Sequence, residues 1–99
     1  MAQVVKSDGT VVVVTPENGH TFMIDEIGTL VNGFAFYIPV PFPNGRFPVT
    51  YDAMFIDQDG LSKFREGTAK ANRRASMATG REIYGNVFTC KTSEHESVE

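Results

Sequence analysis

Most of the positive charge of this sequence lies in one short stretch. Residues 61–82 contain six of the nine basic residues and two acids, so this stretch carries a formal charge of +4. The remainder of the 99-residue chain must then carry −7, because the net charge is −3. A basic patch on an acidic protein attracts phosphates, and its small extent suits a small phosphorylated ligand better than a long polyanion. The basic residues are Lys63, Arg65, Lys70, Arg73, Arg74 and Arg81.

Residues 72–80 indicate how such an anion would bind. If Asn72 caps a helix, Arg73 and Arg74 lie in its first turn, where free backbone N–H groups and two guanidiniums could converge on a phosphate. Alternatively, the helix begins at Thr68, and both arginines lie on its solvated face. Because two arginines rarely enclose a ligand, we also expect a homo-oligomer with sites near the subunit boundaries. The expected binding residues are Arg73, Arg74, Asn72, Lys70 and Arg65.

Phe42 and Phe47 offer a second kind of site. They lie in the proline-rich segment 39–48, which is a poor place to bury large rings. If exposed, these rings could bind a host protein or stack on a nucleotide base. The alternative functions are therefore a protein-binding inhibitor or adaptor and, third, a single-stranded nucleic-acid-binding protein. Duplex DNA is disfavoured as a partner because the chain is acidic overall.

The sequence contains no recognisable catalytic, cofactor or metal motif. Residues 57–60 match only a fragment of a calcium loop, and a hairpin turn explains them better. His20 and His95 have no partner at metal-ligand spacing, and we expect both to be solvated. Cys90, the only cysteine, is expected to be a buried apolar side chain. We therefore expect no enzymatic activity, no cofactor and no metal ion.

The elements that position these residues follow from turn signals and apolar periodicity. A turn at residues 7–9 joins strands at 4–6 and 10–15, and the valines at 11–14 are expected to be buried on both faces. Residues 21–31 predict a helix that Thr21 caps and that stops at Asn32-Gly33. Further strands are expected at 34–38, 49–56 and 83–91, and a second helix stops at Gly80. Residues 61–64 are expected to be extended or in a loop.

These elements, in the order β-β-α-β-β-α-β, predict an α+β domain. We expect a small, mainly antiparallel sheet of about five strands with two short helices packed on one face. Residues 1–91 would form this single globular domain, and residues 92–99 an acidic, disordered tail. No apolar run approaches the ~18 residues that a membrane span requires. With one cysteine and no signal peptide, we expect a cytoplasmic protein that does not contact membranes.

The chain contains four spaced motifs, which are Leu30-Val31-Asn32-Gly33, Asp57-x-Asp59-Gly60, Asn72-x-x-Ala75-Ser76, and Gly80 followed by Tyr84-Gly85-Asn86-Val87-x-x-Cys90. It resembles a domain-of-unknown-function family of small proteins encoded by phages, plasmids and the bacteria that carry them. Here Asn32 replaces a usual glycine, and the proline expected shortly before Asn72 is missing. The resemblance transfers no catalytic residue. It implies a mobile-element accessory protein in the host cytoplasm that could sequester a nucleotide signal of host defence.

Overall fold

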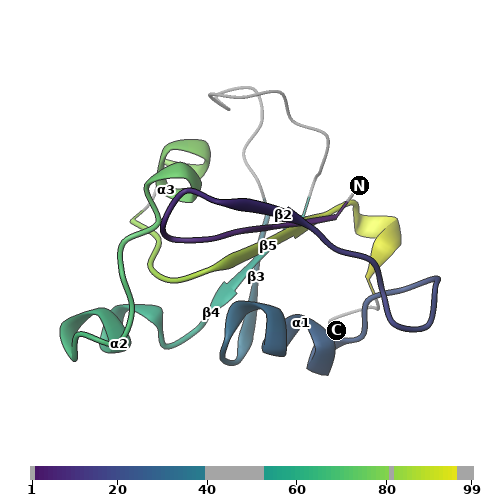
Figure 1. Cartoon of the computed structure of the whole chain (residues 1–99), viewed down its shortest axis with the longest axis horizontal. Coiled ribbons are helices and arrows are strands. Elements are labelled where there is room, and N and C mark those ends of the chain that lie inside the picture. The colour runs from purple at the N-terminus through teal and green to yellow at the C-terminus, as the bar shows by residue number, and fades with distance from the viewer. Residues whose placement is uncertain (1, 40–52, 81, 96–99) are drawn as a thin grey trace.

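The computed structural model describes residues 2–39, 53–80 and 82–95. Five strands form one sheet in the order β2-β1-β5-β4-β3, with every neighbouring pair antiparallel (Figure 1). This confirms the predicted α+β class. The elements in chain order are β1 (Gln3–Val5), β2 (Val11–Val13), α1 (Ile24–Val31), β3 (Ala35–Pro39), β4 (Ala53–Asp57), α2 (Gly60–Arg65), α3 (Arg73–Thr79), β5 (Val87–Cys90) and the 3-10 helix η1 (Thr92–Glu94).

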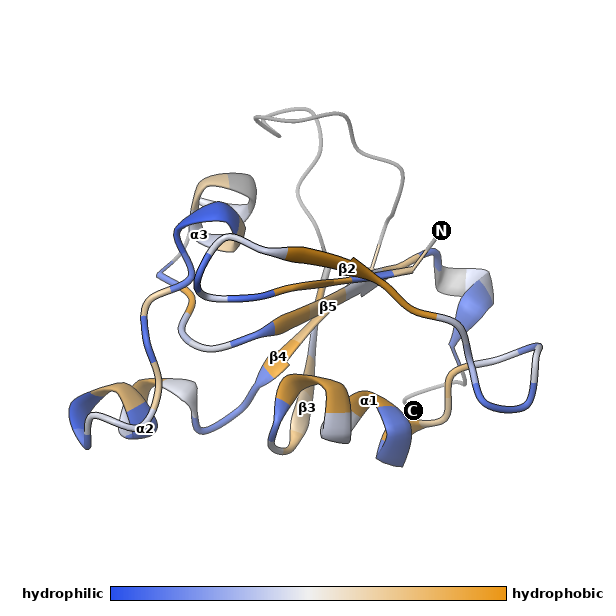
Figure 2. Cartoon of the chain, viewed as in Figure 1, coloured by the Kyte–Doolittle hydropathy of each residue, from blue (hydrophilic) through white to orange (hydrophobic). Residues whose placement is uncertain are grey.

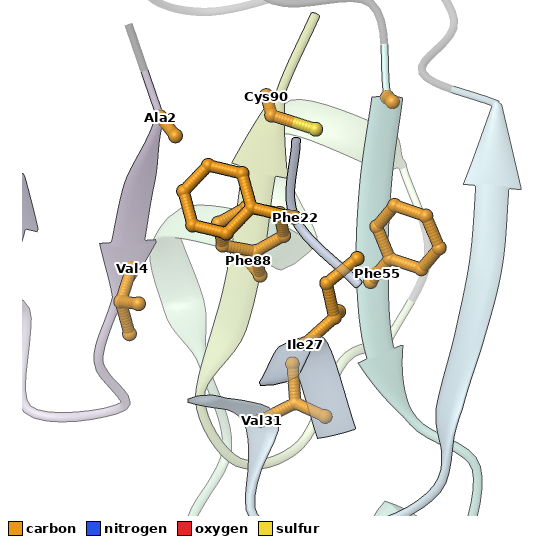
Figure 3. Packing of buried hydrophobic residues seen from close by; sticks show 9 residues of the cluster. Ala2, Val4, Phe22, Ile27, Val31, Phe55, Phe88 and Cys90 are labelled. Carbon is orange, nitrogen blue, oxygen red and sulfur yellow. The ribbon is translucent and has the colours of Figure 1, made fainter. Parts of the chain in front are cut away.

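One face of the sheet packs against α1. Ile27 and Val31 of this helix lie with Phe55 and Phe88 of the central strands in one buried cluster (Figure 3). The ring of Phe22 meets that of Phe88 edge to face, with 4.6 Å between the centroids. Full burial of each such side chain contributes about 1.5–3 kcal/mol. This cluster also encloses the thiol-bearing Cys90, so its predicted burial is confirmed.

The opposite face of the sheet packs against α3. Met54 and Val87, neighbours of Phe55 and Phe88 along their strands, belong to a second cluster that includes Ala75 of α3. Successive strand residues point to opposite faces, so α1 and α3 cover different sides of the sheet. The prediction that both helices share one face was wrong. Adjacent apolar residues in β4 and β5 require cover on both faces.

The strand β2 lies at one edge of the sheet and, among the described residues, pairs only with β1. Val12 keeps 37% and Val13 keeps 55% of its surface exposed. The prediction that the valine run is buried on both faces was therefore wrong. A run of valines favours a strand, but the position of that strand in the sheet decides its burial.

The helix α1 begins later than predicted. Met23, not Thr21, is its N-cap residue, and the Glu26 carboxylate accepts the Met23 N–H at 3.4 Å. Asn32 ends the helix in the left-handed conformation (φ 62°), which confirms the predicted stop.

The helix α2 was not predicted. Asp57 accepts the N–H of Asp59 at 2.9 Å and turns the chain from β4 directly into α2, so the predicted hairpin turn was wrong. Phe64 then stacks on Tyr84, with ring centroids 4.5 Å apart. So short a helix is not stable in isolation, and this tertiary contact supports it.

Part of the predicted tail is folded. Residues 92–94 form η1, and the Phe22 N–H donates to the Glu94 carbonyl at 2.7 Å. His95 is half-buried, with its ring 4.9 Å from that of Phe55, so its expected solvation was wrong, whereas His20 is exposed as expected. Residues 96–99 lie outside the described ranges. Within those ranges, no helix is long and apolar enough to cross a membrane.

Candidate anion-binding site

The basic residues belong to one continuous stretch, α2, the connection after it and α3, which we call the basic segment (residues 60–80). It contains five basic residues and one acid, Glu66, and so carries a formal charge of +4. The two helices lie at the same end of the sheet, and Figure 2 shows hydrophilic stretches in α2 and at the start of α3. The fold therefore keeps the charge asymmetry of the sequence at one end of the molecule.

Among the described residues, Lys63 is the member of this segment that forms an ion pair. Its Nζ lies 2.6 Å from Oδ2 of Asp57 and donates to the Asn32 carbonyl at 2.7 Å. The Asp57 side chain is only 4% exposed, and a carboxylate so buried requires a partner. A Cβ at Gly33 would overlap this carboxylate, so glycine is needed there. Lys63 therefore has a structural role, because it links α2 to β4 and to the end of α1.

Asn72 has a structural role as well. Its Oδ1 accepts the Ala75 N–H at 3.1 Å, so of the two helix starts that the sequence left open, the one after Asn72 is found and the one at Thr68 is not. Its Nδ2 donates to the carbonyls of Val5 at 2.8 Å and Gly85 at 2.9 Å. The side chain is fully buried, so the geometry does not support its assignment as a ligand contact.

The next residues of the same motif extend this network. Ser76 Oγ donates to the Asn72 carbonyl at 2.7 Å and accepts the Ile83 N–H at 2.9 Å. Ala75 is 1% exposed and faces the second core cluster, where a larger side chain would not fit. The Asn72-x-x-Ala75-Ser76 motif thus fastens α3 to β1 and to the chain before β5.

Arg73 and Arg74 occupy the first turn of α3, as expected for a helix that Asn72 caps, and both side chains are exposed. That turn contains no acidic residue, so each guanidinium faces the positive helix end without compensation. The helix has only seven residues, and Asn72 already accepts the N–H of Ala75. The arginine side chains, rather than the backbone of the helix end, are what an anion would contact.

Lys70 and Arg65 differ in their surroundings. Lys70 is exposed, and its carbonyl accepts the Gly85 N–H at 2.8 Å, which fixes the backbone at this point. Arg65 is exposed near Tyr84, whose hydroxyl donates to Glu82 at 3.0 Å. That hydrogen bond raises the pKa of Tyr84, and the charge of Arg65 acts in the opposite direction.

A cavity of about 250 Å³ lies beside Lys70. Its polar lining includes Ser7 from the β1–β2 turn, Thr68 from the basic segment and Asn86 just before β5. The Lys63–Asp57 ion pair also lines it. Typical small-molecule sites measure about 300–1,000 Å³, so this cavity suits a phosphate group and not a whole nucleotide.

The basic sequence pattern did not reveal Ser7 and Asn86 as lining residues. They come from segments far apart in the chain, and the Ser7 N–H donates to Asn86 Oδ1 at 3.2 Å. The one available signal was Asn86 itself, which stands inside the Gly85-Asn86-Val87 motif. Phe42 and Phe47 lie outside the described residues, so their predicted role as an interface stays a prediction.

A larger hollow, about 720 Å³, lies between α1 and β3. Its lining includes Ile24, Phe34 and Gln58, and Asp25 is the one charged residue among the described residues that line it. A carboxylate without a nearby cation repels phosphate, so this hollow does not suit the predicted ligand. Within the part of the chain that the structure describes, no group of three or more His, Cys, Asp or Glu side chains could hold a metal ion.

Fold and site together define a small α+β protein with an exposed basic segment beside a phosphate-sized cavity. Comparison of the chain with family models, curated proteins and solved structures finds no significant match. The resemblance to a family of phage and plasmid proteins therefore stays a prediction, and the geometry of the side chains carries the functional argument.

Proposed function

We propose that the protein is a non-enzymatic binding module that captures a small phosphorylated ligand at the basic segment. The supporting observation is the contrast among the cations of this segment. Lys63 neutralises Asp57, whereas the exposed side chains of Lys70, Arg73 and Arg74 have no such partner among the ion pairs of the described residues. They lie on an acidic protein, where an incoming anion meets attraction at this end and repulsion elsewhere.

The cavity beside Lys70 gives the ligand its orientation. One phosphate group fits there, beside Lys70 and Ser7, whereas the Thr68 hydroxyl already donates to the Lys63 carbonyl at 3.1 Å. Arg73 follows Lys70 by three residues, so their Cα atoms are at most about 11 Å apart. A second phosphate or a sugar outside the cavity can therefore meet Arg73 and Arg74 while the first stays in the cavity. Guanidinium–phosphate contacts are charge-assisted and often bidentate, which makes them strong for their number.

Because the cavity would bind one phosphate group and the two arginines the rest of the ligand, the affinity should depend on the size of the ligand. Inorganic phosphate would fill the cavity without contacting both arginines, whereas pyrophosphate and nucleotides would contact both. We therefore expect affinity to rise from phosphate to pyrophosphate and to nucleoside diphosphates. In the cell, a chain of this kind would sequester a phosphorylated signal, such as a nucleotide of host defence, without changing it chemically.

Thermal shift and calorimetry with phosphate, pyrophosphate and a panel of mono-, di- and cyclic nucleotides test the proposal. A ligand at about 100 times its Kd should stabilise the protein by about 2.7 kcal/mol. That corresponds to a rise in Tm of roughly 10 °C or more for a domain of this size. The Arg73→Ala/Arg74→Ala variant should keep its Tm without ligand and lose most of the ligand-induced rise.

Lys6→Ala/Lys91→Ala is the matched control, because it removes two exposed cations from outside the basic segment. It should bind as the wild type does. Equal loss in both variants would mean that net charge alone attracts the anion, and unchanged binding by the arginine variant would contradict the proposal. Measurements at low and moderate salt separate local contacts from long-range attraction, which is screened within about 8 Å at physiological ionic strength.

A further inference from the structure

The outer edge of β2 carries main-chain groups that, among the described residues, bond to no other strand. The Lys6 N–H donates to the Thr10 carbonyl at 2.8 Å, and the Val14 N–H donates to the Ala2 carbonyl at 3.1 Å. Hydrogen-bonding direction alternates along an antiparallel strand. The N–H and C=O groups of Thr10, Val12 and Val14 therefore face β1, and those of Val11, Val13 and Thr15 point outward.

The edge strand β2 is short, with three residues, but the side chains around it do not oppose an additional strand. Natural sheets protect their edges with lysine, proline, bulges or very short strands. Residues 10–15 read Thr-Val-Val-Val-Val-Thr, with no charge, proline or glycine. Four consecutive valines strongly favour extended pairing, and Val13 exposes more than half of its surface.

The other edge of the sheet, β3, is built differently. The Gln58 N–H donates to the Phe34 carbonyl at 2.9 Å, so Phe36 and Ile38 bond toward β4. Ala35, Tyr37 and Pro39 then form the outward row. Pro39 has no N–H, so this row lacks a donor at its end, a common means of protecting an edge strand. Of the two edges, β2 is the one suited to pairing.

We propose that β2 pairs with β2 of a second copy of this chain, in antiparallel orientation, to form a continuous sheet of ten strands. The occupant follows from the sequence of the edge. A second copy presents the same uncharged segment, so over residues 11–15 only valines and threonines oppose one another and no like charges meet. A two-fold axis perpendicular to the sheet relates the copies, as in a symmetric dimer.

The outward row also determines the register. A two-fold axis perpendicular to the sheet leaves each face of the sheet continuous. In such a pairing, one residue of β2 lies directly opposite the same residue of the second copy, and the axis passes between the two. Centred on Val13, the pairing places Val13 opposite Val13 and Val11 opposite Thr15. All three outward residues then exchange N–H···O bonds, about six in the dimer. This register also covers Val13, the more exposed of Val12 and Val13. The proposal does not rest on the anion site.

Sedimentation velocity across a concentration series of the full chain tests the pairing. The wild type should be a dimer, and Val13→Lys should be a monomer because two ammonium groups would meet at the axis. Phe36→Lys is the matched control, since it places the same charge at a half-exposed position on the opposite edge strand. It should leave the dimer intact. Near-unchanged circular dichroism would show that both variants fold.

Cysteine cross-linking tests the register independently of stability. Under mild oxidation Val13→Cys should form a disulfide-linked dimer, because directly opposed Cα atoms lie about 5.5 Å apart. Val12→Cys and Phe36→Cys should not, and the wild type controls for buried Cys90. A monomeric wild type would overturn the proposal, as would a dimer that survives Val13→Lys. Cross-linking through Val12→Cys alone would overturn the Val13-centred register.

Discussion

Replacing Asn72 with alanine is the sharpest test of how the basic segment is held. The substitution removes three hydrogen bonds at once: the cap to Ala75 and the bonds to the Val5 and Gly85 carbonyls. An N-cap replaced by alanine typically costs about 1 kcal/mol, and each further buried hydrogen bond about 1 kcal/mol. We therefore expect Asn72→Ala to lose about 3 kcal/mol, a large part of the 5–15 kcal/mol that a domain usually has.

Urea unfolding followed by circular dichroism measures this loss directly. The control is Asn18→Ala, which removes an exposed asparagine whose Oδ1 accepts from His20 and Thr21, both at 2.8 Å. Because that turn is solvated, water replaces the lost bonds, and we expect a change below about 1 kcal/mol. Asn72→Asp should be no milder than alanine, since it keeps the cap acceptor but turns a carboxylate toward two carbonyls. Equal, small losses at positions 72 and 18 would refute the reasoning.

Two further perturbations test other parts of the segment. Asp57→Ala should destabilise the protein by about 2–3 kcal/mol, because it leaves the half-buried Lys63 without its partner and removes the acceptor that turns the chain into α2. The control, Asp59→Ala, changes an exposed residue and should alter the stability in urea by less than about 0.5 kcal/mol. A similar loss for both would contradict a specific ion pair. Ultraviolet titration should find the pKa of Tyr84 above its ordinary value of 10.0 and lowered again in Glu82→Gln. Because the folded-state pKa is raised, this hydrogen bond stabilises the fold below pH 10 and is lost as the pH rises through that pKa. A titration of Tyr84 unaffected by Glu82→Gln would remove this assignment.

Features encoded by a few neighbouring residues could be predicted from the sequence. The turn at residues 7–9 joins β1 and β2, Asn32 ends α1, and Asn72 caps the helix that Gly80 terminates. Each depends on local backbone preferences, such as the left-handed conformation at Asn32 and Gly80. The central strands were also predicted, because their apolar residues form continuous runs between turn signals.

Features that depend on distant partners could not be predicted in this way. The helix α2 rests on a ring contact between Phe64 and Tyr84, twenty residues apart. The face that α3 covers follows from strand order, and so does the exposure of Val12 and Val13. Charge counting located the basic segment but not the pairing of Lys63 with Asp57, since that pairing needs the turn between β4 and α2.

Several of the most recognisable residues of the sequence therefore have structural roles, although Asp57, Lys63 and Asn86 also line the cavity. Asn72, Ser76 and the Gly33–Asp57–Lys63 group use their polar atoms or their small size within the fold. Relatives that share such motifs could share the scaffold and bind different ligands, because specificity would lie in exposed side chains such as Arg73 and Arg74. Mutational tests must therefore separate residues that hold the fold together from residues that would contact the ligand. Loss of binding in Asn72→Ala would follow from loosening of α3, whereas loss in the arginine variant, with Tm unchanged, would report on the ligand itself.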